Sequence, residues 1–379
     1  MQGAVRFSLE PVSEPGALED EWRELAIRAG AGFFQGWTWT GTWLAHLPPE
    51  ASVLVLRGRG AAGTLLLGLF GVAPVRFRGL IRRQALLLGE LGRMPQDGLT
   101  IEHNGFLVDP ASPGAIGAAL SYLEDCGVEW DLLRLPGLDR ASADACMRQT
   151  RLVPRITARK ACPVLDLDRV RAAAGEPFSW LGRSTRAAAR RTFRRLAGEG
   201  ELRLRKAREP AEAREMFARL VEWHQARWRR RGAPGAFADP WTLAFHADLI
   251  AHGLPRGEVD LLQLEAGGRP QGVLYNFRSG DRVMNYQGGF RLGDERDIRP
   301  GLALHVLAIA DYAAEGLSVY DHLAGENALK RSLASRMEEM VWLELWRRGG
   351  LVRIEELARR ARASVRARLG AFHRGMESF

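Results

Sequence analysis

Hydrophobic positions along the first part of the chain alternate between helical and strand-like spacing. Apolar residues recur at helical intervals over 19–29 and 113–126, which predicts two helices. Apolar runs bounded by turn formers predict strands, and these are 52–57, 64–75, 85–88, 105–108 and 131–135. Residues 136–170 show neither spacing clearly and are interpreted as a mixed connection.

The second part, 178–348, has a clearer order of elements. Capping residues, prolines and glycines bound five predicted helices, at 184–197, 210–231, 240–253, 301–315 and 326–334. We expect Ser184 or Thr185 to cap the first of these helices and Asp239 to cap the third. Short turn segments join predicted strands at 259–265, 272–278 and 282–288, which indicates an antiparallel meander. Further strands are predicted at 202–205, 317–323 and 338–347.

Composition limits the class of protein. The chain has 379 residues, of which 46% are hydrophobic, so it can form about two globular domains. Its three cysteines, at 126, 146 and 162, have no metal-ligand or disulfide spacing, which predicts a reducing compartment and no metal. The N-terminus has no signal-peptide pattern and no run is long enough to span a bilayer, so we expect a cytoplasmic protein.

The net charge of +9 is concentrated in two segments. Residues 183–231 hold 16 basic and 6 acidic residues, and 347–374 hold 9 and 2, so the remaining chain is net acidic. Over 351–379 an apolar helical stripe lies opposite arginines. This pattern is typical of a helix at an anionic membrane surface, here the inner membrane, or of a helix that packs on the protein's own sheet.

Several sequence blocks carry a family resemblance. In the first part they are FQGWTWTGTW (34–43) and GELGRMPQDGLTIEHNGFLV (89–108). In the second part they lie at 183–196, 220–232, 286–290 (YQGGF), 299–316 and 320–334 (YDHLAGENALKRSLA). In this order the chain resembles GNAT-fold acyltransferases of the BioF-like/CelD acetyltransferase group, relatives of the FemAB peptidyl transferases.

The resemblance implies an α/β (α+β) fold with two GNAT-like lobes, each a mixed, mostly antiparallel sheet flanked by helices. We expect a first lobe at 1–165, a GNAT acetyltransferase domain at 166–350 and a basic amphipathic helix at 351–379. It also implies acyl-CoA or acetyl-CoA as co-substrate.

The helix predicted after Pro300 is the candidate cofactor site. Its first turn offers free backbone N–H groups and the positive end of the helix dipole. Gly301 would let a pyrophosphate approach closely, and Arg296 and Arg299 add charge. Arg299 stands where related enzymes carry the first glycine of their loop. The alternative is an ordinary helix that begins with proline.

The block at 320–334 holds the candidate catalytic residues. Asp321 lies near the end of a predicted strand, and Glu326 and Lys330 are four residues apart on a helix, a spacing that allows an ion pair. Lys330 is one of three lysines in an arginine-rich chain, which indicates a need for a compact ammonium. The alternative is a surface pair. Leu329 replaces the tyrosine that relatives usually carry.

Histidines and polar residues on neighbouring elements complete the candidate site. His305, one turn inside the helix after Pro300, could act as a base or serve in packing. His224 and Trp228 lie on an apolar helix face typical of a core, and the resemblance makes them candidates for a substrate pocket. Asn285 and Tyr286 lie on the strand that lines the acyl groove in GNAT folds.

These features predict an N-acyltransferase that moves an acyl group from a CoA thioester to an amine by direct attack. The acceptor would be a small molecule or a lipid, such as an amino acid, an amino sugar or a sphingoid base. Asp321, Glu326 or a histidine would be the base. The first alternative is a FemAB-like aminoacyl-tRNA-dependent transferase, the only case in which nucleic acid is an expected partner. The second is a non-catalytic partner in lipid or polysaccharide biosynthesis.

Overall fold

The computed structural model describes residues 5–61, 63–77, 81–173, 178–291 and 299–348. Its α-helices are α1 (Pro15–Ala29), α2 (Trp37–Ala45), α3 (Ala115–Asp125), α4 (Arg140–Gln149), α5 (Asp168–Ala172), α6 (Arg183–Gly198), α7 (Pro210–Arg229), α8 (Pro240–Gly253), α9 (Pro300–Ala314) and α10 (Ala328–Leu333). Its strands are β1 (Arg6–Pro11), β2 (Val53–Gly60), β3 (Gly63–Phe77), β4 (Ile81–Leu88), β5 (Leu107–Val108), β6 (Leu132–Asp139), β7 (Val153–Asp166), β8 (Leu202–Lys206), β9 (Val259–Ala266), β10 (Arg269–Ser279), β11 (Arg282–Phe290), β12 (Val319–Asp321) and β13 (Arg336–Trp346).

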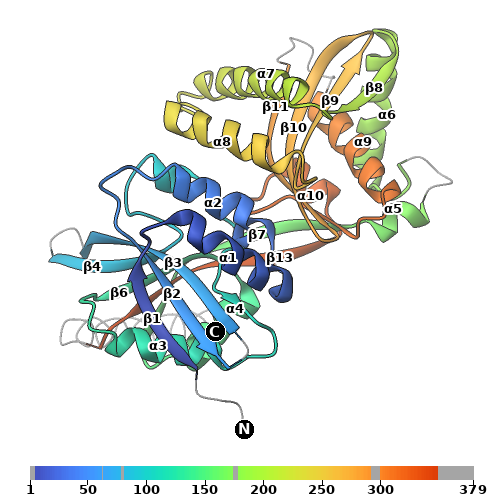
Figure 1. The fold of residues 1–379 in the computed structure, drawn as a ribbon. Coiled ribbons are helices and arrows are strands. Elements are labelled where there is room, and N and C mark those ends of the chain that lie inside the picture. Colours follow the sequence, from blue (N-terminus) through green and yellow to red (C-terminus); the bar gives the residue numbers. More distant parts are fainter. Residues whose placement is uncertain (1–4, 62, 78–80, 174–177, 292–298, 349–379) are drawn as a thin grey trace, which may run out of the picture.

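The strands form one continuous sheet in the order β1-β2-β3-β4-β6-β13-β7-β12-β11-β10-β9-β8, with β5 paired to β3. We call the half from β1 to β13, with α1–α4, the first lobe, and the half from β7 to β8, with α6–α10, the second lobe (Figure 1). Among the described strands, only the pairs β4–β6 and β11–β12 are parallel, one in each lobe. The predicted mixed, mostly antiparallel sheets are therefore confirmed, including the meander β9-β10-β11.

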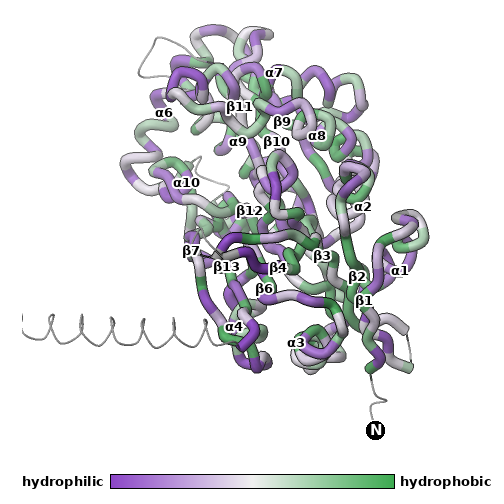
Figure 2. Tube along the Cα trace, turned by 90° about the vertical axis from the view of Figure 1, so that its left-hand side faces the viewer, coloured by the Kyte–Doolittle hydropathy of each residue, from purple (hydrophilic) through white to green (hydrophobic). Residues whose placement is uncertain are grey.

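The two lobes exchange their last strands at the centre of the sheet. In the sequence, β7 directly follows the strands and helices of the first lobe, but it pairs with β12 of the second lobe. In the sequence, β13 comes after the elements of the second lobe, but it pairs with β6 of the first lobe. β7 and β13 also pair with each other along most of their length, and both pass between the lobes in Figures 1 and 2. The lobes are thus joined by backbone hydrogen bonds as well as by side chains.

The interpretation of 136–170 as a mixed connection is wrong, because this segment contains α4 and the long strand β7. Much of β7 is partly exposed and charged, and its two prolines weaken the strand pattern. The cap prediction at Ser184 or Thr185 is also wrong, since α6 begins at Arg183 after Gly182. The Asp239 cap is confirmed, because its carboxylate accepts a hydrogen bond from the Trp241 N–H.

The two parallel pairs differ in what lies beyond their last paired residues. In the first lobe, Asn104 bridges the diverging strands. Its backbone N–H donates to the Gly137 carbonyl, and its side-chain amide donates to the Leu88 carbonyl. Ile101 lies in the same space, since Cβ atoms on Gly89 and Gly137 would stand 3.0 Å and 2.6 Å from its atoms. The gap of the first lobe is therefore occupied by the protein's own loop.

No helix within the described ranges is long and apolar enough to cross a membrane. The predicted basic helix at 351–379 lies outside the described residues.

Candidate functional site

The candidate site lies where β11 and β12 part in the second lobe. The two strands pair only as far as Met284 and Asp321. Just beyond, the register of β10 on β11 shifts, so that Asn276 faces Asn285 while Tyr275 faces Gln287. Tyr286 is the extra residue of this bulge and has no partner on β10. Its backbone N–H stands outside the regular ladder, a position suited to stabilise an oxyanion.

Lys330 lies beside this gap on α10, and its ammonium group donates to the carbonyl of Ala324, with an Nζ···O distance of 3.3 Å. Asn327 caps the helix by accepting from the backbone N–H of Lys330. Burial lowers the pKa of Lys330, although the negative charge of Glu102 opposes that shift. A buried ammonium with a lowered pKa can polarise a carbonyl or exchange a proton with a substrate.

Glu102 reaches this position from the first lobe. Its carboxylate is 4% exposed and accepts a hydrogen bond from the backbone N–H of Ala324. Burial raises the pKa of Glu102, while the bond from Ala324 and the charge of Lys330 act in the opposite direction. Buried Glu102 and partly buried Lys330 therefore place one ionisable group from each lobe at the gap.

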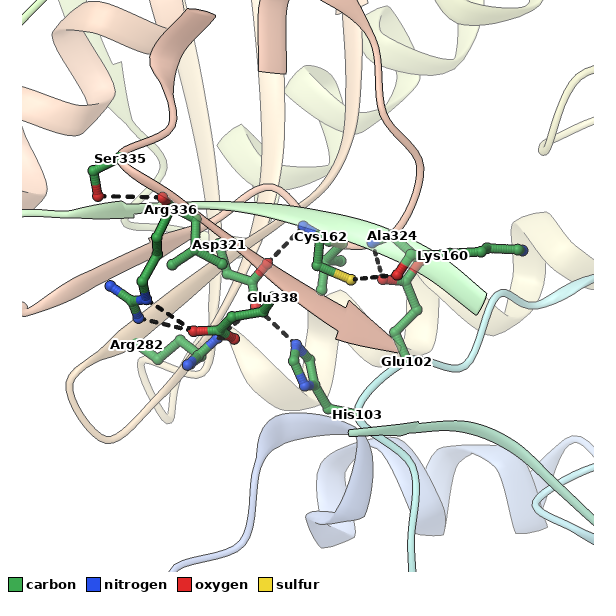
Figure 3. Close-up of polar contacts among 12 residues, drawn as sticks. Glu102, His103, Lys160, Cys162, Arg282, Asp321, Ala324, Ser335, Arg336 and Glu338 are labelled. Atoms are coloured by element: carbon green, nitrogen blue, oxygen red, sulfur yellow. Dashed lines mark hydrogen bonds and ion pairs between the residues drawn. The ribbon is translucent and has the colours of Figure 1, made fainter. Parts of the chain in front are cut away.

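The next residue, His103, points toward Asp321 of the second lobe (Figure 3). Its Nε2 lies 2.7 Å from Oδ2 of Asp321, and the Arg282 guanidinium donates to the same oxygen at 2.7 Å. The other oxygen of Asp321 accepts from the backbone N–H of Leu323. Burial alone would raise the pKa of Asp321, but the bond from His103 and the charge of Arg282 outweigh it and lower that pKa. Asp321 therefore stays ionised.

A second group of histidines lies on the α9 side of the sheet. His305 Nδ1 is 3.0 Å from the Tyr320 hydroxyl, and the His305 and His322 ring centroids are 5.6 Å apart. Burial lowers the pKa of His305 to about 3, and burial together with His305 lowers that of His322. Neither ring nitrogen of the fully buried His322 has a hydrogen-bond partner among the described residues. Both rings are therefore neutral, and His305 is poorly suited to act as a base.

The N-terminus of α9 is covered by an aromatic ring. A Cβ on Gly301 would stand 3.2 Å from the Phe290 ring, and Cβ atoms on Gly288 and Gly272 would stand 2.9 Å and 2.7 Å from it. Three glycines thus form a cradle for Phe290, and its ring occupies the space over Gly301. Arg299 is exposed beside it, and Arg296 lies outside the described residues. A ligand can reach Gly301 closely only if Phe290 turns away.

The predicted substrate-pocket residues are spread over two places. Tyr286 lies in the aromatic core, with ring centroids 4.8 Å from Phe277 and 5.2 Å from His246. Burial, followed by the charge of Glu102, raises the pKa of Tyr286, so its side chain faces the Glu102 side of the gap. Asn285 points to the opposite face, where its amide donates to Asn276 at 2.8 Å.

His224 and Trp228 lie further away. The Trp228 indole donates to Nε2 of His224 at 2.9 Å, so these two residues satisfy each other. The rings of Phe237 and His246 stand between His224 and Tyr286. The core alternative for His224 fits this placement better than contact with a ligand at the gap.

The predicted ion pair between Glu326 and Lys330 is not formed. Glu326 is exposed and binds Arg331 instead, while Lys330 turns inward toward Ala324 and Glu102. A spacing of four residues would bring the two side chains together on one helix. Asn327 is the N-cap of α10, however, so Glu326 precedes the helix. The Glu326 side chain therefore faces solvent and does not reach the gap.

The structure therefore brings Asp321, Lys330, His305 and Tyr286 to the gap, and it adds Glu102 and His103. Neither Glu102 nor His103 was predicted as a site residue, although both lie in the block 89–108 that carries the family resemblance. The sequence offered one signal, an acid beside a histidine within that block and outside any periodic element. Among the described residues, no group of three or more His, Cys, Asp or Glu side chains could hold a metal ion.

The comparisons with known proteins agree with this architecture. The model of the GNAT acetyltransferase domain matches residues 183–331. The crystal structure of FemX has a TM-score of 0.57 at 11% identity, covering 88% of this chain and 96% of its own. L-PGS from Bacillus licheniformis has a TM-score of 0.54 at 11% identity, covering 89% and 94%.

The C-terminal domain of a putative lysylphosphatidylglycerol synthetase from Agrobacterium fabrum has a TM-score of 0.52 at 11% identity, covering 91% of this chain and 95% of its own. A comparison with curated proteins gave no match. At these identities the likeness to solved structures concerns the fold. The predicted α/β fold is confirmed, and the family model agrees with a GNAT domain in the second lobe.

Proposed function

We propose, from the premise that residues 183–331 form a GNAT-type acetyltransferase domain, that this protein is an acyl-CoA-dependent N-acyltransferase. The observation that carries the proposal is the gap beyond Met284 and Asp321, with the bulge at Tyr286 on one side and Lys330 on the other. A gap between diverging strands can hold an extended pantetheine arm, and a bulge frees a backbone N–H toward it.

In this proposal the thioester lies in the gap and the pyrophosphate meets the N-terminus of α9. The Gly301 N–H and the helix dipole favour an anion there, and exposed Arg299 adds charge. The Tyr286 N–H stabilises the oxyanion that forms on the carbonyl, and Lys330 lies on the opposite side of the gap. The acceptor amine attacks the carbonyl carbon directly, and the thiolate leaves with the electrons of the C–S bond.

The acceptor amine remains open between an amino acid, an amino sugar and a lipid base. We further propose a cytoplasmic protein whose segment 351–379 contacts anionic membranes, as its stripe of apolar residues opposite arginines suggests. Sedimentation with phosphatidylglycerol vesicles, with and without this segment, tests that contact. Equal binding of the two forms would contradict it.

Aminoacyl-tRNA is the alternative acyl donor. It is favoured by the fold shared with FemX and by the net positive charge of 183–231. Thermal shifts separate the two donors, because a ligand that binds the native state raises its melting temperature. Acetyl-CoA or a long-chain acyl-CoA should stabilise the protein. Salt-sensitive tRNA binding without any CoA effect would favour the alternative. Stabilisation without turnover would favour a non-catalytic partner.

A further inference from the structure

A cleft of about 1150 Å³ opens between the two lobes. The first lobe contributes the end of α1 and residues 30–38, and the second lobe contributes the β10–β11 turn. The exchanged strands supply Cys162 and Glu338. Met284, the last residue of β11 that pairs with β12, also lines the cleft. The cleft therefore extends to the point where the proposed thioester gap begins.

His103 lies in the wall of this cleft. The residues directly before and after it in the sequence hold its backbone in place. Its φ of 47° is in the left-handed region, which a residue other than glycine adopts only when its surroundings impose it. Before it, Glu102 is bound to Ala324 of the second lobe. After it, Asn104 is bound to Gly137 and Leu88 of the first lobe. The backbone thus holds the imidazole against Asp321.

The groups around the ring define its tautomer. Nε2 contacts Oδ2 of Asp321, and the Arg282 guanidinium donates to that same oxygen. Glu338 lies beside Arg282, and Glu102 precedes His103 in the chain. With Nε2 donating to the Asp321 carboxylate, Nδ1 is left as the proton acceptor. Nδ1 makes no hydrogen bond to any residue within the described ranges. This is the geometry of a base oriented by a buried carboxylate.

We propose that His103 is the general base of the acyl transfer and that Asp321 positions it, in an acceptor site shared by both lobes. The inference rests on the proposed function. His103 Nδ1 takes the proton from the acceptor nitrogen, the nitrogen forms a bond to the thioester carbonyl carbon, and the C–S bond breaks. The imidazolium then returns its proton to the leaving thiolate or to water.

The cleft also indicates the class of acceptor. Its wall carries both signs of charge, with Arg140 paired to Glu339 and Arg282 paired to Glu338. Such a surface solvates a hydrophilic molecule, whereas an alkyl chain would leave these charges without water. We therefore assign a primary amine on a hydrophilic compound, with room for one as large as an amino sugar.

The test compares two histidine–aspartate pairs that both join the lobes. His103 and Asp321 are 2.7 Å apart in the cleft, and His46 and Asp248 are 2.8 Å apart outside it. Full-length H103Q and H46Q are assayed for thiol release from acetyl-CoA with glucosamine, lysine and ethanolamine as acceptors. Acetyl-CoA binding is measured in parallel by calorimetry, and imidazole is added as a rescue.

We expect H103Q to lower kcat/KM by about 10²–10⁴-fold with unchanged acetyl-CoA affinity, partly restored by imidazole, while H46Q stays near wild type. Equal turnover of H103Q and H46Q would overturn the base assignment. Acetyl-CoA binding without turnover of any of these amines would overturn the acceptor class. Absence of acetyl-CoA binding would instead refute the proposed function, and the base with it.

Discussion

Glu102 of the first lobe accepts a hydrogen bond from the backbone N–H of Ala324 in the second lobe, across 222 positions of sequence. The adjacent His103 binds Asp321 at the same junction (Figure 3). Two consecutive residues of the first lobe therefore contact two positions of the second lobe, Ala324 and Asp321. The loop that carries them fills the gap of the first lobe, so only the second lobe keeps an open gap within the described residues.

Glu102→Gln should reduce activity more than stability. The amide oxygen can still accept from Ala324, but the charge that supports the Lys330 ammonium is lost, so its pKa should fall further. We expect kcat to drop about tenfold, as one lost charge interaction of roughly 1.4 kcal/mol would give. Glu21→Gln is the control, since Glu21 binds Arg57 and Arg59 far from the gap. A larger loss of kcat in the control would contradict this role.

Lys330→Arg should lower turnover although it keeps the positive charge. The planar guanidinium cannot occupy the confined space beside Ala324 in the same way as a compact ammonium. We expect at least a tenfold fall in kcat/KM. Lys206→Arg is matched, because Lys206 is also largely buried and contacts Asp311 and Glu315 near the other edge of the sheet. Similar rates for the two variants would show that Lys330 has only a structural role.

Gly301→Ala should weaken acyl-CoA binding. The new methyl group would take up space at Gly301, where the pyrophosphate has to approach the helix N-terminus closely. Gly16→Ala is the control, since Gly16 follows Pro15 at the start of α1 and has open space around it. We expect a KM for acetyl-CoA raised about tenfold in G301A alone. Phe290→Ala alone should lower this KM, because the ring no longer covers Gly301, and an unchanged KM would show that the ligand does not bind there.

Much of the second lobe was predictable because each element carries its own signal. Asp239 caps α8, Pro300 begins α9, and short turns join β9, β10 and β11. The strand exchange was not predictable, because the partners of β7 are set by residues far along the chain. Glu102 and His103 were missed for the same reason, since nothing local reveals contacts with Ala324 and Asp321.

Stability should decrease as the pH falls below neutrality. Burial lowers the pKa of His305 and of His246 to about 3 each, whereas both would bind a proton near 6.5 when unfolded. The stabilisation is therefore complete above pH 6.5 and is lost as the pH falls toward 3. At pH 5.5 the free energy of unfolding should be lower than at neutral pH by about 1.4 kcal/mol for each histidine.

Urea unfolding at pH 7.5 and 5.5 measures this loss. His305→Gln removes one of the two groups, so its loss between these pH values should be smaller than that of the wild type by about 1.4 kcal/mol. Equal losses in the two proteins would mean that His305 is protonated in the native state.

The binding stoichiometry of a non-hydrolysable acetyl-CoA analogue tests the central claim most directly. Calorimetry on the full-length protein should give one site per chain, because the gap of the first lobe is filled by Ile101 and Asn104. Gly301→Ala should weaken that single site, and Gly16→Ala should not. Two equivalent sites, or none, would contradict the account.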